Sequence, residues 1–227
     1  MKLVSAIRRQ TVTLIAALGL VACGSAGSED AANPQMVSDA ERAISDIVLG
    51  DTGAPLTMIE YASWTCGHCL QYHEDIMPIL LDEYIEQGKL RLVFREFPTA
   101  PANVSVAGFA IARCAGPDKY FDVLDELFKR QSAIISLIRN GGQVRAALIQ
   151  IGLNNGIPNE ETIEACLADN DILRAISTSI ARGDAQGVRA TPTIFLNGEQ
   201  LVGSNWRSPD AMRTILDDAL TESGDNL

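Results

Sequence analysis

Apolar residues along the chain recur at two spacings, and the change of spacing divides the chain into parts. Between Leu56 and Ala62 they occupy both alternating sets of positions, which is typical of a buried central strand. Residues 66–87 carry an apolar stripe at helical spacing, and Pro78 inside it predicts a kink. Residues 90–97 are again strand-like. Strand, helix and strand at this spacing predict a right-handed parallel βαβ unit.

The pattern is helical throughout residues 102–186, and no repeat of fixed period stands out. Glycine and asparagine breaks separate five predicted helices, at residues 103–115, 118–131, 143–151, 159–168 and 171–186. Behind this block, apolar runs at 193–196 and 199–202 flank Asn197-Gly198, which predicts a β-hairpin. Ser208-Pro209 predicts the start of a final helix. An all-helical block therefore interrupts an α/β unit.

The beginning of the chain has the pattern of a targeting segment. A positive stretch ending at Arg9 precedes an apolar stretch over residues 11–22. Twelve helical residues span about 18 Å, which is shorter than the roughly 30 Å core of a bilayer. We therefore expect residues 1–22 to be a signal peptide. A core helix is the alternative.

The end of that segment, Leu20-Val21-Ala22-Cys23, resembles the bacterial lipobox, whose cysteine becomes the lipidated first residue of the mature protein. Cleavage near Ala22 without lipidation is the alternative. Residues 23–40 are small and polar, and they predict a flexible tether that carries the lipid on Cys23. The expected location is thus outside the cytoplasm, anchored in the cell envelope by lipid, on the periplasmic side in a Gram-negative cell.

Composition narrows the class of protein. The chain of 227 residues is 47% hydrophobic and 21% charged, which is typical of a globular protein. Its formal net charge is −11. Such a surface repels nucleic acid and anionic lipid headgroups, so we expect no nucleic-acid partner and membrane contact only through the lipid anchor.

The candidate chemistry lies in Cys66-Gly67-His68-Cys69, where the strand runs into the helix. The N-terminus of a helix presents free N–H groups and the positive end of the dipole, which stabilise a thiolate. Cys66 comes first and is predicted to be the nucleophile. Cys69, one turn further in, is predicted to be the buried resolving thiol, and His68 adds a partial positive charge. A C-x-x-C pair beside a βαβ unit indicates a thioredoxin-like redox motif.

The other cysteines leave alternatives open. A zinc site is one, but it needs four ligands, and the chain has only two histidines and no second pair of closely spaced cysteines. Without Cys23, four cysteines remain, and pairing Cys66 with Cys69 leaves Cys114 with Cys166. Two unpaired buried thiols are the alternative for that second pair. The sequence carries no nucleotide-binding or metal motif, so we expect no cofactor beyond the cysteine pair.

Two motifs in order give a resemblance to a known family. Ile59-Glu60-Tyr61-Ala62-Ser63 runs into the cysteine pair, and Ala190-Thr191-Pro192-Thr193-Ile194-Phe195-Leu196-Asn197-Gly198 follows about 120 residues later. Over residues 46–220 the sequence resembles the DsbA-like bacterial exported thiol–disulfide oxidoreductases. The resemblance implies an α/β, thioredoxin-like fold: a central mixed β-sheet flanked by helices and interrupted by an all-helical insertion. The expected parts are residues 41–101 and 187–222 for the thioredoxin fold, 102–186 for the insertion, and 223–227 for a tail.

The resemblance also implies roles for single residues. Pro192 is expected to be a cis-proline facing the active disulfide, with the Thr191 backbone pairing with an extended substrate. Trp64, beside the cysteine pair, is predicted to join in substrate binding. Glu60 matches the family's buried acid beneath the resolving cysteine; a polar residue tolerated at the strand end is the alternative. His73 shares a helical side with the cysteines, and we interpret it as a packing or surface residue.

The expected function is that of a membrane-tethered protein thiol–disulfide oxidoreductase, acting as a monomeric dithiol oxidase. Its expected partners are reduced or unfolded exported proteins and a second redox protein that reoxidises it. The Gly-His dipeptide departs from the Pro-His of the family archetype, which leaves the redox potential open. A reductase or isomerase of the same fold is one alternative. A metal-binding lipoprotein and a binding protein with an idle dithiol are the others.

Overall fold

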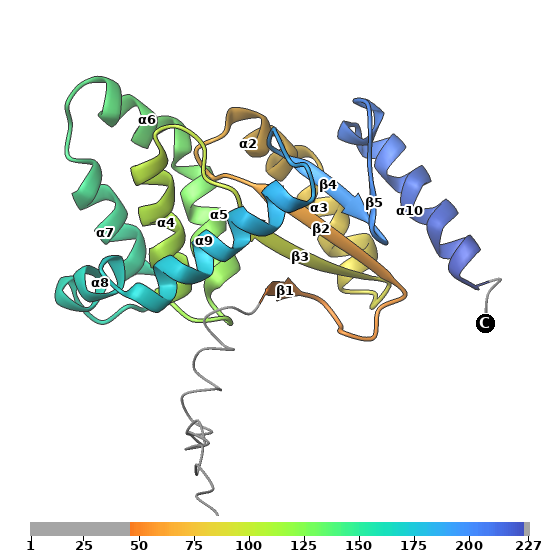
Figure 1. Cartoon of the computed structure of the whole chain (residues 1–227), viewed down its shortest axis with the longest axis horizontal. Coiled ribbons are helices and arrows are strands. Elements are labelled where there is room, and N and C mark those ends of the chain that lie inside the picture. The colour runs from red at the N-terminus through yellow and green to blue at the C-terminus, as the bar shows by residue number, and fades with distance from the viewer. Residues whose placement is uncertain (1–45, 225–227) are drawn as a thin grey trace, which may run out of the picture. The chain divides into compact units, whose positions relative to one another are not determined.

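The computed structural model describes residues 46–224 (Figure 1). The predicted signal peptide, Cys23 and the tether at residues 23–40 lie outside that range. Over the range itself, the structure contains no helix with the length and apolar character needed to cross a bilayer.

A mixed sheet forms the centre of the described residues. Its five strands are β1 (Ile47–Leu49), β2 (Leu56–Ala62), β3 (Leu90–Glu96), β4 (Thr193–Leu196) and β5 (Glu199–Gln200). They lie in the order β1-β3-β2-β4-β5, with β2 parallel to β3 and the other pairs antiparallel. The parallel βαβ unit and the hairpin at Asn197-Gly198 are confirmed, although β5 ends two residues before the predicted boundary. The sequence analysis did not predict β1.

The helix after β2 is more broken than predicted. It consists of α2 (Gly67–Asp75), α3 (Met77–Ile79) and a π-helix, η1 (Leu80–Ile85). The break falls at Ile76, two residues before Pro78. Proline has no N–H to donate to the carbonyl four residues earlier, and its ring collides with that carbonyl, so the regular helix ends ahead of it.

The helices of the insertion lie between residues 102 and 185, and the expected range was 102–186. They are α4 (Ala102–Cys114), α5 (Tyr120–Lys129), α6 (Gln131–Arg139), α7 (Val144–Asn154), α8 (Glu160–Leu167) and α9 (Asn170–Ala185). The helix predicted over 118–131 is shorter in the structure, where α5 ends at Lys129, and the sequence analysis did not predict the helix α6 that follows. After the hairpin come a 3₁₀ turn, η2 (Asn205–Arg207), and α10 (Pro209–Gly224), which starts where the Ser208-Pro209 signal predicts.

Two faces of the sheet carry different layers. The α2–η1 segment and α10 pack on one face, against a core that includes Leu56, Met58 and Leu92. On the other face α9 crosses the sheet, and Gly183 lies against Phe97 and Tyr61 (Figure 1). A Cβ at Gly183 would lie 2.8 Å from Phe97, so the close approach of α9 requires glycine. In this arrangement, α2 starts close to the end of β2.

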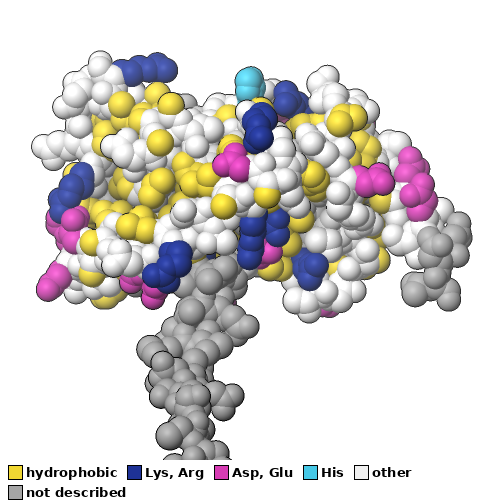
Figure 2. Space-filling view, viewed as in Figure 1, with side chains coloured by type: hydrophobic (Ala, Val, Ile, Leu, Met, Phe, Trp, Pro, Cys, Tyr) yellow, Lys and Arg dark blue, Asp and Glu magenta, His cyan; other side chains and the backbone are white. Residues whose placement is uncertain are grey.

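A second core lies inside the insertion and reaches the cysteine pair. It contains Trp64 and Cys69 together with Phe109, Tyr120 and Leu127 of α4 and α5. The space-filling view shows hydrophobic side chains gathered over the helices of the insertion (Figure 2). Part of this surface is a hollow of about 270 Å³ between α4 and α7, lined mainly by aliphatic side chains such as Val104, Leu148 and Ile149.

Candidate active site

The two cysteines of the motif lie at the start of α2, as predicted. Cys66 is the N-cap of the helix, with extended backbone angles (φ −86°, ψ 124°), and its N–H donates to the carbonyl of Ser63 at 3.0 Å. Cys69 lies one turn further along and is fully buried, whereas Cys66 is half-buried. Both carry free thiols in this structure. An incoming sulfur can therefore reach Cys66 but not Cys69.

Hydrogen bonding lowers the pKa of Cys66 to about 5. The thiol of Cys69 makes the largest contribution, because it donates a hydrogen bond to the Cys66 sulfur, and the backbone N–H groups of Cys69 and His68 add to it. Partial burial acts in the opposite direction but is outweighed. Cys66 is therefore a thiolate at neutral pH, which is the reactive form of a cysteine.

The pKa of Cys69 shifts the other way. Burial raises it, and the neighbouring Cys66 sulfur raises it further. The N–H of Ser63 donates a hydrogen bond to the Cys69 sulfur at 3.5 Å, which acts in the opposite direction but is outweighed. The pair thus holds one proton at neutral pH, and that proton is on Cys69.

Glu60 lies in the middle of β2, where it pairs with Phe94 of β3 and Ile194 of β4. Its side chain is 2% exposed, and burial raises its pKa to about 8. Among the described residues, its Oε2 atom has no hydrogen-bond partner. Its charge also raises the pKa of Cys69, which places it near the buried sulfur. A carboxyl group in this position is able to hold a proton at neutral pH.

The segment before β4 forms the other wall of the site. The Thr191–Pro192 peptide bond is cis, and the Thr191 carbonyl oxygen lies 3.4 Å from the Cys66 sulfur, where it accepts a hydrogen bond only when Cys66 is protonated. A hollow of about 120 Å³ lies beside it, lined by His68, Gln71, Tyr72, Pro192 and Arg207. His68 is exposed at the rim of this hollow, away from the interior. The sequence motifs at Cys66 and Pro192, 126 positions apart, thus meet in one place.

The prediction that Trp64 binds substrate is wrong. Its side chain is fully buried, and its Nε1 donates to the carbonyl of Ser105 at 2.9 Å. The ring lies so close to α4 that a Cβ at Gly108 would come within 2.3 Å of Nε1. Trp64 therefore ties the active-site segment to the insertion and is out of reach of a substrate.

A residue that the sequence analysis missed holds the active-site turn from behind. Gln131, at the start of α6, is buried, and its Nε2 donates to the carbonyls of Trp64 at 2.6 Å and Cys66 at 2.9 Å. No local pattern could have revealed this, because the partners are 65 and 67 positions apart in the chain.

Small hydroxyl side chains form a second support that the sequence analysis missed. The Ser63 hydroxyl lies 2.8 Å from that of Ser105 and 2.9 Å from that of Thr65, and it accepts from the Thr99 N–H at 3.1 Å. Ser63, Thr65 and Ser105 are all buried, and polar side chains in apolar surroundings were the only available signal. These contacts join the segment before Cys66 to the loop after β3 and to α4.

The two other cysteines in the described part of the chain form a disulfide. Cys114 at the end of α4 is bonded to Cys166 in α8, with an S–S distance of 2.01 Å and 5.9 Å between the Cα atoms. The alternative of two unpaired thiols is therefore excluded in this structure. Among the described residues, no group of three or more potential ligand side chains could hold a metal ion.

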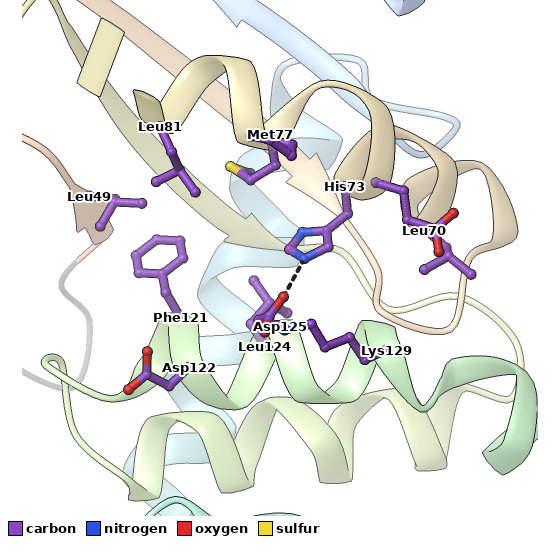
Figure 3. Close-up of a pocket in the computed structure, with 12 residues that line it drawn as sticks. Leu49, Leu70, His73, Met77, Leu81, Phe121, Asp122, Leu124, Asp125 and Lys129 are labelled. Carbon is purple, nitrogen blue, oxygen red and sulfur yellow. Dashed lines mark hydrogen bonds and ion pairs between the residues drawn. The ribbon is translucent and has the colours of Figure 1, made fainter. Parts of the chain in front are cut away.

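His73 has the packing role that we predicted, in a larger cavity of about 690 Å³ next to the active-site helix. It stacks on Phe128, with 4.5 Å between ring centroids, and its Nε2 lies 3.0 Å from a carboxylate oxygen of Asp125. Apolar side chains of β1, the α2–η1 segment and α5 line this cavity, with Phe121 and Met77 among them (Figure 3). The stacking of the His73 ring on Phe128 and its hydrogen bond to Asp125 join α2 to α5, away from the sulfurs.

Residues 42–218 match the sequence model of a thioredoxin family. A Rickettsia felis protein named "Putative protein-disulfide oxidoreductase" is 31% identical over 177 residues, which cover 78% of this chain and 61% of that protein. The chain spans between 61% and 66% of the length of three such Rickettsia relatives.

Two solved structures share the fold. Alpha-DsbA1 of Wolbachia pipientis superposes with a TM-score of 0.68 at 23% identity, over 80% of this chain and 94% of that chain. Oxidised BdbD of Bacillus subtilis superposes with a TM-score of 0.64 at 18% identity, over 78% of this chain and 93% of that chain. The family match, the relatives and the helical insertion agree. The chain belongs to the thioredoxin family, and its fold is that of the DsbA structures, with the helical insertion.

Proposed function

We propose that this chain is a protein thiol–disulfide oxidoreductase that uses Cys66 and Cys69 to oxidise the thiols of exported proteins. The observation that carries the proposal is the asymmetry of the two sulfurs. The pKa of the accessible Cys66 is lowered to about 5, and that of the buried Cys69 is raised. A stabilised thiolate favours the reduced pair over the disulfide, so the disulfide is an oxidant.

In the first step, a substrate thiolate attacks the Cys66 sulfur of the oxidised pair. The bond between Cys66 and Cys69 breaks, and a bond between Cys66 and the substrate sulfur forms. Cys69 leaves with the electron pair and takes up a proton, as its raised pKa requires. Glu60 is buried near it with a pKa of about 8 and is the group that we assign as the proton donor.

In the second step, another thiolate of the substrate attacks the substrate sulfur of the mixed disulfide. Cys66 leaves as a thiolate, stabilised by the Cys69 thiol and by the N–H groups at the start of α2. The substrate has then lost two electrons and formed a disulfide, and the protein pair has gained them. A redox partner protein must remove two electrons from the pair before another cycle. The reaction requires no further cofactor.

The backbone beside Cys66 supports binding of an extended substrate. The Thr191 carbonyl lies 3.4 Å from the Cys66 sulfur, so a chain lying along this segment would have its cysteine at the reactive sulfur. Pro192 lines the adjoining hollow. We assign substrate binding to Thr191 and Pro192.

Oxidation of a reduced, unfolded disulfide protein tests this function. Wild type should restore the disulfides, and Cys66→Ser should be inactive. Cys69→Ser, with Cys66 first converted to a mixed disulfide by glutathione disulfide, should exchange glutathione for a substrate with a single thiol and retain that substrate on Cys66, because no Cys69 thiol is present to displace it. A potential near −120 mV against glutathione buffers is expected of a strong oxidant, and one near −270 mV would instead indicate a reductase. Full activity of Cys66→Ser would refute the proposal.

We also propose that the chain acts at the outer side of a membrane as a lipid-anchored monomer. The support is the sequence of residues 1–40, with the lipobox-like run ending at Cys23. Labelled fatty acid should be incorporated into the wild type in bacterial cells but not into Cys23→Ser, and that variant should leave the membrane fraction. Equal labelling of the two proteins would contradict the proposal.

A further inference from the structure

Among the residues that line the hollow beside Pro192, Arg207 alone carries a formal charge. Arg207 and His68 line it together with Gln71 and Tyr72, and no carboxylate is among its lining residues. This is unexpected in a chain with 29 acidic and 18 basic residues. The larger cavity next to α2, in contrast, has three acidic side chains in its lining, Glu74, Asp122 and Asp125, together with Lys129 and His73. Figure 3 labels four of these five, all but Glu74.

Arg207 is held in place without using its charge on an acidic partner. It ends η2, and its guanidinium lies over the ring of the buried Trp206, 4.8 Å from the ring centroid. Trp206 in turn packs edge-on against Tyr72, which also lines the hollow. Within residues 46–224, the ion pairs found for arginines involve Arg95, Arg113, Arg130, Arg145, Arg174, Arg182, Arg189 and Arg213 and do not include Arg207.

The position of the hollow determines what would meet this arginine. A substrate chain whose cysteine reaches Cys66 passes the Thr191 carbonyl and continues over Pro192. Side chains that flank the substrate cysteine then lie over the hollow. A carboxylate there would accept charge-assisted hydrogen bonds from the planar guanidinium, which presents paired donors that match a carboxylate.

We propose that Arg207 forms a subsite for a carboxylate next to the reactive cysteine of the substrate, so that the protein favours acidic cysteine-containing segments. This inference rests on the proposed oxidase function, since it concerns the rate of the same reaction. A partly exposed ion pair contributes modestly, and we expect an advantage of about three- to fivefold over a neutral side chain.

The test uses the oxidised full chain and reduced dithiol peptides with blocked ends. Each peptide pair carries glutamate or glutamine beside one cysteine, placed in turn before and after it. The measured quantity is the second-order rate constant of peptide oxidation. In at least one position the glutamate peptide should react about three- to fivefold faster, and the ratio should shrink at high salt because the interaction is between charges.

Arg207→Gln should reduce the ratio of the two rates to about one. Arg174→Gln is the matched control: it removes the same charge from an exposed arginine of α9 that pairs with Asp171, and it should keep the ratio of the wild type. A peptide with glutamine beside the cysteine and a free terminal carboxylate separates the side-chain source from the terminal one. A ratio near one for every wild-type pair, or a ratio unchanged in Arg207→Gln, would overturn the subsite. If no peptide is oxidised, the proposed function itself fails.

Discussion

Replacing Gln131 by leucine should loosen the active-site turn from a helix that lies 65 positions further along the chain. The side chain of Gln131 is 5% exposed, and its amide donates to the carbonyls of Trp64 and Cys66. Leucine has a similar size but no donor. The Cys66 carbonyl would keep its bond from the Leu70 N–H at 3.1 Å, whereas the Trp64 carbonyl would lose the hydrogen bond that Gln131 makes.

The magnitude follows from these two losses. A buried carbonyl left without a partner costs about 1–3 kcal/mol, and loss of the second hydrogen bond costs about 1 kcal/mol. We therefore expect the free energy of unfolding to fall by about 2–4 kcal/mol. With a urea dependence of about 2 kcal/mol per molar, the midpoint of unfolding should fall by about 1–2 M.

The assay compares urea unfolding of reduced wild type, Gln131→Leu and a control. Gln150→Leu is the control, because Gln150 is exposed on α7 and bonds only within its own helix, to Asn154. That variant should unfold near the wild-type midpoint. The alkylation rate of Cys66 as a function of pH is a second measurement, and its midpoint should rise in Gln131→Leu as the turn relaxes. A midpoint of unfolding no lower than that of Gln150→Leu would refute the reasoning.

Three further predictions concern the titrating groups and the disulfide. The absorbance of the Cys66 thiolate should give a pKa of about 5, and the stability of the reduced wild type relative to Cys66→Ser should rise between about pH 5 and pH 9, since unfolded Cys66 binds a proton there that folded Cys66 does not; a titration near pH 9 would contradict this. Glu60, with a pKa of about 8, holds a proton that the unfolded chain releases near pH 4.5, so its contribution to stability falls over that window. Glu60→Gln should therefore gain stability relative to wild type as the pH rises from 5 to 8. Denaturation measured at both pH values checks this, and a difference in free energy of unfolding between the two proteins that is the same at pH 5 and pH 8 would contradict it. Removing the disulfide in Cys114→Ala/Cys166→Ala should cost about 4 kcal/mol for a sequence separation of 52 residues, and thermal melting of the two proteins checks this.

The local pattern of residues was sufficient to predict most of the strands and helices. The apolar residues on both faces of Leu56–Ala62 and the turn chemistry of Asn197-Gly198 predict β2 and the hairpin, because strand and turn preferences depend on neighbours in the chain. The three-residue strand β1 and the helix α6 were not predicted. A short edge strand is stabilised by its partner β3 more than by its own residues, so its sequence carries little signal.

The sequence by itself determined that two cysteines would stand at the start of a helix and that an X-Pro motif would follow an inserted block. Only the tertiary structure decided which side chains surround them. Trp64 is an aromatic residue beside the cysteine pair, as in a binding site, yet it packs against Gly108 and is buried in the interior. Gln131 and Arg207 acquire their roles from segments that folding brings together. The physical reason is that the pKa of a thiol and the reach of a substrate depend on burial and on neighbours in space, which positions along the chain do not specify.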